Sequence, residues 1–365
     1  MKKTLFPIAA IALTLAACNS TPKFTVNGTI AGEKNGNVLL VQQNGSELDT
    51  LAKSAVTDGK FALTGTVNEL TDVYLLVEGK RGGFPIFLEN TVYTANLDFT
   101  KPGESKIEGT ENQKLFNDYN AIAMESRKFQ QSIMMEYRQA YQAKDVDKMN
   151  ELKEKSDKKS AEMAAKEEAL FAAHSDSFVV AFILSQKASG MEAEELQASF
   201  DKLGENAKAS KPGKTIAERL AKLAKVAVGQ VAPDFTLNTP EGKPLSMHSI
   251  KAKVKVIDFW ASWCGPCRGE NPNVVAMYNE LHSKGLEILS VSLDNNKDAW
   301  VKAIADDKLT WNHVSDLKGW KSAAAQLYAV NGIPHLVVLD ENNVIVAKNL
   351  RGAALKAKVA ELLAK

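Results

Sequence analysis

Two cysteines with two residues between them lie where an apolar run is followed by a segment that we interpret as a helix. The apolar run covers residues 254–259, and the sequence Cys-Gly-Pro-Cys follows at 264–267. A short apolar run of this kind predicts a buried strand, whereas residues 264–282 have the length of a helix. The chain is therefore constrained to a strand–helix unit that places one cysteine at the N-terminus of the helix.

That position has a chemical consequence for Cys264. Free backbone N–H groups and the helix dipole favour an anion there, so we expect a lowered thiol pKa and the role of attacking nucleophile. Cys267, shielded and one helical turn further on, would resolve a mixed disulfide by a second thiolate attack. Gly265 leaves room for a partner chain, and Pro266 suits the first helical turn because its missing N–H costs nothing there.

Two other interpretations of the cysteine pair are weaker. A zinc site would need two further ligands at a suitable spacing. The histidines in this part of the chain form no paired pattern: His248, His282, His313 and His335. A purely structural disulfide that closes so short a loop would add little stability. We therefore expect neither a metal nor another cofactor.

The N-terminus has the pattern of an export signal. Two lysines precede an apolar run at residues 5–15, and Leu-Ala-Ala-Cys at 15–18 matches the bacterial lipobox. The run is too short to cross a bilayer core of about 30 Å. We expect residues 1–17 to be removed as a lipoprotein signal peptide and residues 18–23 to form a tether lipidated at Cys18. The alternative is a plain secretory signal in which this cysteine plays no part.

The expected compartment is the cell envelope, on the periplasmic side, with the protein lipid-anchored to a membrane. Disulfides form and need managing outside the cytoplasm. No apolar run after Cys18 approaches about 20 residues, the length of a membrane-spanning helix. The formal net charge is +1 and no basic stripe occurs, so we expect no nucleic-acid partner.

Three further regions follow the expected tether. Short β-type runs with turn signals between them, such as Asp58-Gly59, fill residues 24–110 and predict an antiparallel β-sandwich. Residues 111–227 predict a helical segment, a connector or a partner-binding surface. In its first part, apolar residues follow one another at spacings of three, four or seven positions, as on one face of a helix: Leu115, Tyr119, Ile122, Phe129, Ile133 and Tyr137. Residues 228–365 alternate strand and helix, which indicates a central sheet covered by helices.

Several motifs in this last region resemble known proteins. Residues 256–267, Val-Ile-Asp-Phe-Trp-Ala-Ser-Trp-Cys-Gly-Pro-Cys, look like the active-site strand and helix of thioredoxin. Ile333-Pro334 resembles the cis-proline dipeptide of that fold, although Pro334 lies 67 residues beyond Cys267, farther than in small thioredoxins. The extra length and Arg-Gly-Glu-Asn-Pro at 268–272 resemble the TlpA-like and ResA-like thiol–disulfide oxidoreductases, which are related to the redoxin (AhpC/TSA) group. Residues 24–225 resemble, more weakly, the region that precedes such domains in Bacteroidetes lipoproteins.

The resemblance implies an α/β thioredoxin-like fold for residues 228–365 and a docking face around the sulfurs. Pro334 would be cis and would face the two cysteines, and the backbone of Ile333 could then pair with an extended substrate strand. Trp263, together with Gly265 and Pro266, would shape the same face. Trp263 is expected to contribute to docking rather than to the chemistry.

Two carboxylates compete as proton acceptor for Cys267. Asp258 stands in an apolar strand, where burial would raise its pKa towards that of a general base, and it matches the buried aspartate of thioredoxin. Glu270 matches the glutamate of the ResA-like branch, and its alternative is a solvated residue on the helix face. Of the two, we favour Asp258 as the proton acceptor.

The expected function is a protein-disulfide reductase tethered in the envelope. Its partners would be disulfide-containing exported proteins and a membrane thiol donor, and the resemblance adds apocytochrome c and cytochrome c maturation as one use. One alternative is a ligand- or partner-binding lipoprotein in which the redox domain is accessory. The other is a thiol peroxidase, because Ala-Pro-Asp-Phe at 232–235 also opens peroxiredoxins.

Overall fold

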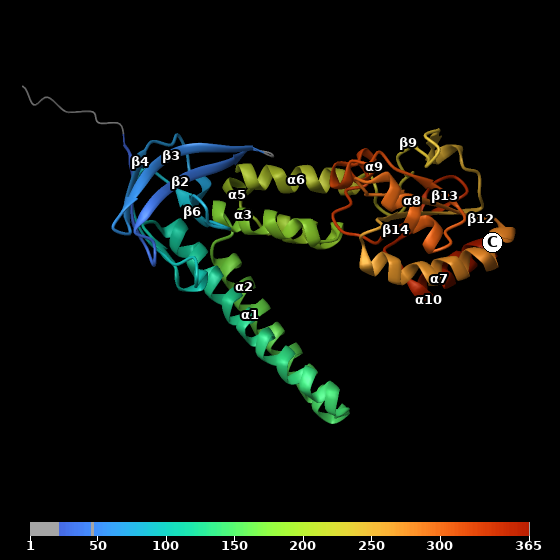
Figure 1. Ribbon diagram of the computed structural model, residues 1–365, viewed down its shortest axis with the longest axis horizontal. Coiled ribbons are helices and arrows are strands. Elements are labelled where there is room, and N and C mark those ends of the chain that lie inside the picture. The colour runs from blue at the N-terminus through green and yellow to red at the C-terminus, as the bar shows by residue number, and fades with distance from the viewer. Residues whose placement is uncertain (1–21, 45–46, 365) are drawn as a thin grey trace, which may run out of the picture. The chain divides into compact units, whose positions relative to one another are not determined.

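A computed structural model describes residues 22–44 and 47–364 (Figure 1). The chain divides into two compact units, with the boundary between Leu170 and Phe171. The expected signal peptide and Cys18 lie outside the described residues. Within the described part, no helix is both long and apolar enough to cross a membrane.

The first unit contains an eight-stranded sheet in the order β6-β5-β2-β3-β4-β1-β7-β8. Its strands are β1 (Phe24–Ile30), β2 (Asn35–Asn44), β3 (Glu47–Thr57), β4 (Lys60–Gly65), β5 (Thr71–Val77), β6 (Phe84–Leu88), β7 (Val92–Leu97) and β8 (Lys106–Glu108). A strand-rich N-terminal region is therefore confirmed. The sandwich of two sheets is not confirmed, because the strands are bonded in one continuous order.

A tight turn of this sheet was predicted from the sequence, whereas the pairing of two distant strands was not. Asp58 and Gly59 have φ angles of 49° and 75°, and they join β3 to β4 as the predicted tight hairpin. Every pair of neighbouring strands is antiparallel except β1 and β7, which run parallel. A parallel pair needs a long connection rather than a turn, so no turn signal in the sequence marks it.

Two long helices complete the first unit, α1 (Glu111–Ala143) and α2 (Val146–Ala173). Thr110 begins α1 by accepting a hydrogen bond from a backbone N–H of its first turn. The helices pack through a small apolar cluster of Ile133, Ala140 and Leu152. Half-buried Lys159 and exposed Lys166 on α2 also pair with a glutamate of α1. Figure 1 shows the two helices side by side.

The second unit opens with helices α3 (Phe178–Lys187), η2 (Ala188–Gly190), α4 (Ala193–Asp201), α5 (Glu205–Ala209) and α6 (Lys211–Ala224). Residues 179–184 of α3 are all buried, as the uninterrupted apolar run predicts. Ser210 caps α6, and Pro212 lies in its first turn, where the missing N–H is tolerated. The helical middle of the chain is therefore confirmed.

A five-stranded sheet in the order β13-β12-β11-β14-β15 forms the centre of the second unit. The strands are β11 (Val254–Trp260), β12 (Leu286–Ser292), β13 (Asn312–Val314), β14 (His335–Asp340) and β15 (Ile345–Lys348). The central strand β11 runs parallel to β12 and antiparallel to β14. All seven residues of β11 are buried, because the sheet is covered on both faces.

Helices α7 (Gly265–Leu281), α8 (Lys297–Asp306), α9 (Ala323–Leu327) and α10 (Gly352–Leu363) accompany this sheet. Figure 1 shows α7 next to α10, and these two helices contact each other. A small hairpin of β9 (Thr236–Asn238) and β10 (Pro244–Ser246) precedes the sheet. The thioredoxin-like C-terminal domain is thus confirmed, although the short strands β9, β10 and β13 were not predicted.

Candidate active site

The two cysteines lie at the N-terminus of α7 and are joined by a disulfide, with Cα atoms 5.3 Å apart. Cys264 is the N-cap residue, and its Sγ accepts a hydrogen bond from the backbone N–H of Cys267 at 3.2 Å. Both residues are buried, at 5% and 1% exposure. After reduction, a Cys264 thiolate would accept the same N–H bond and lie at the positive end of the helix dipole.

The residues between the cysteines leave open space. A Cβ atom placed on Gly265 would meet no neighbour within 4 Å. Pro266 lies in the first turn of α7, as its missing N–H allows. Both residues are exposed. The roles of Gly265 and Pro266 in docking stay predictions.

The peptide bond between Ile333 and Pro334 is cis, as the motif predicts. The carbonyl oxygen of Ile333 lies 3.8 Å from the Sγ of Cys264, so this dipeptide borders the sulfur that would attack a substrate. Arg351 donates a hydrogen bond to the carbonyl oxygen of Pro334 at 2.9 Å and ties the loop to the start of α10. The backbone of Ile333 therefore lies beside the disulfide, and its pairing with a substrate strand stays a prediction.

Asp258 lies in the middle of β11 and is fully enclosed. Its Oδ2 accepts a hydrogen bond from the hydroxyl of Ser290 at 3.0 Å, and that hydroxyl accepts another from the indole of Trp311 at 2.8 Å. Burial raises the pKa of Asp258 to about 6; the hydrogen bond from Ser290 opposes the rise, and the charge of Glu270 adds to it. A carboxyl with this pKa exchanges protons close to neutral pH.

Glu270 is held at both oxygens. Its Oε1 accepts a hydrogen bond from the backbone N–H of Gly352, at the beginning of α10, at 2.6 Å. Its Oε2 accepts one from the side chain of Asn273 at 3.1 Å. A carboxylate at a helix N-terminus is electrostatically favoured. Glu270 thus joins α7 to α10 and is not a freely solvated residue on the helix face. Its role as a proton acceptor stays a prediction.

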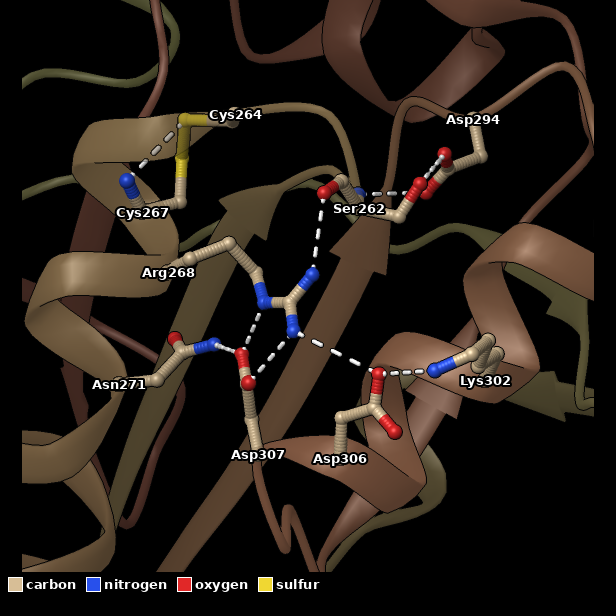
Figure 2. A network of polar contacts seen from close by, with 9 residues as sticks. All are labelled: Ser262, Cys264, Cys267, Arg268, Asn271, Asp294, Lys302, Asp306 and Asp307. Atoms are coloured by element: carbon tan, nitrogen blue, oxygen red, sulfur yellow. Dashed lines mark hydrogen bonds and ion pairs between the residues drawn. A yellow bond between two sulfur atoms is a disulfide. The ribbon is translucent and has the colours of Figure 1, made fainter.

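A polar network fixes the loop that leads into Cys264 (Figure 2). The backbone N–H and the hydroxyl of Ser262 both donate to Asp294, which is buried. The guanidinium of Arg268 donates to the carbonyl oxygen of Ser262 at 3.2 Å and forms a bidentate pair with Asp307. Asn271 donates to the same Asp307 carboxylate at 2.6 Å. The loop before Cys264 and the first turns of α7 are thereby held together.

This network was not predicted from the sequence. Ser262 and Asp294 follow the carboxyl ends of the parallel strands β11 and β12, which meet at one edge of a sheet, so their proximity had a signal in the sequence. Arg268 and Asp307 had none. Asp307 ends α8, 39 residues beyond Arg268 in the chain.

Replacing Arg268 with lysine should lower the free energy of unfolding by about 1 kcal/mol. A lysine keeps the charge but cannot form the bidentate pair with Asp307 or also reach Ser262. Urea denaturation of the oxidised protein measures the change. A Lys302→Gln variant is the control, because it removes an exposed pair with Asp306 and should change the free energy by less than about 0.5 kcal/mol. An Arg268→Lys variant as stable as the wild type would show that the network is dispensable.

Two tryptophans lie exposed beside the disulfide-bearing turn. Trp263 is 54% exposed, and its ring centroid lies 6.2 Å from that of Trp320, which is 44% exposed. Trp260, by contrast, is completely buried. The position of Trp263 is compatible with its expected part in docking, and Trp320 was missed because its segment has no motif.

In the part of the chain that the structure describes, no three or more His, Cys, Asp or Glu side chains form a group that could hold a metal ion. Burial lowers the pKa of His313 to about 4 and that of His335 to about 4. Both imidazoles are therefore neutral at pH 7.

Comparison with known proteins shows similarity in both halves of the chain. The AhpC/TSA family matches residues 228–348, and a domain of unknown function, DUF4369, matches residues 24–116. The thioredoxin-like protein YneN of Bacillus subtilis is 36% identical over 120 residues, which cover 32% of this chain and 68% of YneN. The thiol-disulfide oxidoreductase ResA of Bacillus anthracis is 30% identical over 122 residues, 33% of this chain and 69% of ResA. A solved thiol-disulfide oxidoreductase from Bacteroides fragilis is 34% identical, with 36% of this chain and 99% of that chain covered and a TM-score of 0.35.

Proposed function

Because this chain belongs to the ResA-like thiol–disulfide oxidoreductases, we propose that it reduces disulfides of exported proteins with the dithiol of Cys264 and Cys267. The observation that carries the proposal is the place of the Cys264 sulfur. It caps α7, and it lies 3.8 Å from the carbonyl oxygen that precedes the cis-proline. A substrate strand bound along Ile333 would bring its own disulfide to that sulfur.

The reaction consists of two thiolate attacks. The Cys264 thiolate attacks one sulfur of the substrate disulfide, a mixed disulfide forms, and the other substrate sulfur leaves as a thiolate that takes a proton. Cys267 then loses its proton and attacks the Cys264 sulfur, which releases the second substrate thiol. Two electrons pass to the substrate, and the enzyme is left with the Cys264–Cys267 disulfide. A thiol donor at the membrane must reduce it again.

Asp258 is the proposed acceptor of the Cys267 proton. Its pKa of about 6 gives it a large ionised fraction at pH 7 while its basicity remains higher than that of an ordinary aspartate. Glu270 has both oxygens in hydrogen bonds to α10 and Asn273, so we assign it a supporting role through its charge.

The direction of the reaction and the location of the protein belong to the same proposal. The Gly-Pro dipeptide between the cysteines resembles that of reducing family members. We place the protein in the envelope, on the periplasmic side, held at a membrane by a lipidated Cys18, where apocytochrome c would be one class of substrate. A Cys18→Ser protein that stayed in the membrane fraction of cells would contradict the lipid anchor.

A Cys267→Ala variant tests the proposed function directly. Without the second thiol the mixed disulfide between Cys264 and the substrate cannot be released, so the variant should accumulate covalent adducts in cells. Non-reducing electrophoresis followed by mass spectrometry identifies them. The matched control is Cys264→Ala, which keeps one thiol but lacks the attacking one. If both variants gave the same adducts, the assignment of the nucleophile would be wrong.

A further inference from the structure

A pocket of about 430 Å³ opens beside the cis-proline. One side is formed by the loop that contains Ile333 and Pro334, next to the Cys264 sulfur. The other side comes from outside the thioredoxin-like domain: residues 189–192, between α3 and α4, and Arg219 of α6. The helical segment thus supplies part of the surface that a substrate would meet at the redox centre.

We call residues 189–192 and Arg219 the helical wall of the pocket, and direct hydrogen bonds hold it in place. Arg219 donates to the carbonyl oxygens of Ala188 at 2.7 Å and Ser189 at 3.1 Å. Asn331, in the loop before the cis-proline, donates to the same Ser189 oxygen at 3.3 Å. On the other side, Asn349 donates to the carboxylate of Glu192 at 3.0 Å. The wall is therefore tied both to α6 and to the cis-proline side of the pocket.

The charge of the pocket is predominantly positive. Arg219, Lys348 and Arg351 contribute three cations, and Glu192 contributes the only carboxylate among the lining residues. Three of the lining side chains, those of Arg219, Asn331 and Arg351, donate hydrogen bonds to backbone carbonyl oxygens around the pocket.

Burial lowers the pKa values of two residues that line the pocket, and neighbouring charges act on both. Burial lowers the pKa of His335 to about 4, and the charges of Lys348 and Arg351 act in the same direction. Burial also lowers the pKa of Lys348, an effect that Glu192 and Glu194 oppose and Arg219 strengthens. An anion in the pocket would lower the electrostatic free energy of these neighbouring cations.

We propose that this pocket binds an acidic side chain of the substrate polypeptide, an aspartate or glutamate close to the cysteine that Cys264 attacks. The inference rests on the proposed function and specifies its substrate class. A substrate strand along Ile333 advances about 3.3 Å per residue, and its side chains alternate between two faces. The acidic residue would thus lie about two residues from the attacked cysteine. Arg219, Lys348 and Glu192 become specificity-determining residues, and the helical segment acquires a role in substrate choice.

The test compares two disulfide-bonded peptides that differ only in a glutamate or a glutamine two residues from the cysteine. The full chain in neutral detergent reduces each peptide with dithiothreitol as the recycling reductant, and kcat/KM is measured. We expect the acidic peptide to be preferred about three- to tenfold at low salt, the effect of one charge among partly solvated cations. Raising the salt to about 0.5 M should reduce the preference, because it shortens the screening length.

Three charge-neutralising variants identify the pocket. Lys348→Gln should reduce the preference for the acidic peptide, and Glu192→Gln should increase it, because the two substitutions change the pocket charge in opposite directions. Lys356→Gln is the control: Lys356 lies on α10, pairs with Glu280 and does not line the pocket. It should leave the preference unchanged. The Glu192→Gln variant keeps the test informative even if Lys348→Gln fails to fold, because an increased preference for the acidic peptide requires a folded protein.

The outcomes separate the two proposals. Equal kcat/KM for the two peptides with the wild-type protein would overturn the acidic pocket and leave the reductase standing. A preference that neither Lys348→Gln nor Glu192→Gln changes would also overturn it, because the acidic side chain would then be recognised elsewhere. If the wild type reduced neither peptide, the proposed function itself would fail, and the inference with it.

Discussion

A Cys264→Ser protein is expected to lose disulfide-reductase turnover by at least about a thousandfold, as enzymes do when their nucleophile is removed. A serine hydroxyl can still cap α7, since oxygen accepts the N–H bond that the Cys264 sulfur accepts from Cys267. The fold should therefore persist while the attack on the substrate disulfide is lost. Turnover of a disulfide substrate with dithiothreitol as reductant measures the loss, and circular dichroism checks the fold.

The matched control is Cys18→Ser, which removes the proposed lipidation site outside the redox domain and should keep full turnover in detergent. Substantial activity in Cys264→Ser would mean that Cys267 attacks first, although it is only 1% exposed. The free thiol of Cys267 in this variant can be titrated, which shows that the expected disulfide is gone.

The same cysteines distinguish an enzyme from a binding protein. If the N-terminal 200 or so residues captured a ligand and the redox domain were accessory, a double variant Cys264→Ser, Cys267→Ser would keep the cellular phenotype of the wild type. If redox chemistry is the function, that double variant should behave like a deletion strain. Growth of the two strains under conditions where the deletion is defective decides between these cases.

The redox centre could be predicted from the sequence because its determinants are local. The Cys-Gly-Pro-Cys motif, the apolar strand before it and the helix after it lie within about 30 residues. Propensity and capping act over such short distances. The cis bond at Ile333-Pro334 was predicted instead from the resemblance to the thioredoxin fold. The prediction for Asp258 depended on its place in an apolar run and on its match to the buried aspartate of thioredoxin.

What could not be predicted depends on pairings between distant segments. The apolar run 254–259 contains Lys255, and the sequence does not reveal that its ammonium group donates to Met247 and to Asn343, which lies 88 residues away. The parallel pairing of β1 with β7 and the Arg268–Asp307 pair are of the same kind. Each is chosen by the packing of the whole domain rather than by the residues nearby.

An Asp258→Asn protein should be more stable than the wild type at pH 8, and this gain should disappear near pH 4. The pKa of Asp258 is about 6 in the folded protein and 3.8 ordinarily, so the folded state holds its proton more tightly than the unfolded chain. The free energy of unfolding of the wild type therefore falls as the pH rises from the lower pKa to the higher one. The fall is on the order of 3 kcal/mol and is complete above about pH 7. Asparagine does not titrate and still offers an oxygen to Ser290. Urea denaturation of the oxidised proteins between pH 4 and pH 8 measures the difference.

The same variant should release its mixed disulfide about a hundredfold more slowly at pH 7, because Cys267 loses its proton acceptor. Stopped-flow measurement of the second thiol step across pH 5–9 gives its pH profile, and Glu270→Gln is the control, since Glu270 caps α10 and should affect the profile only through its charge. A gain in stability joined to a loss in rate is the signature of an ionisable group that is buried for chemistry at a cost to the fold. If Asp258→Asn left the profile unchanged, the proton would go to Glu270 or to water. If the variant were instead less stable than the wild type at pH 8, burial would not be the source of the raised pKa.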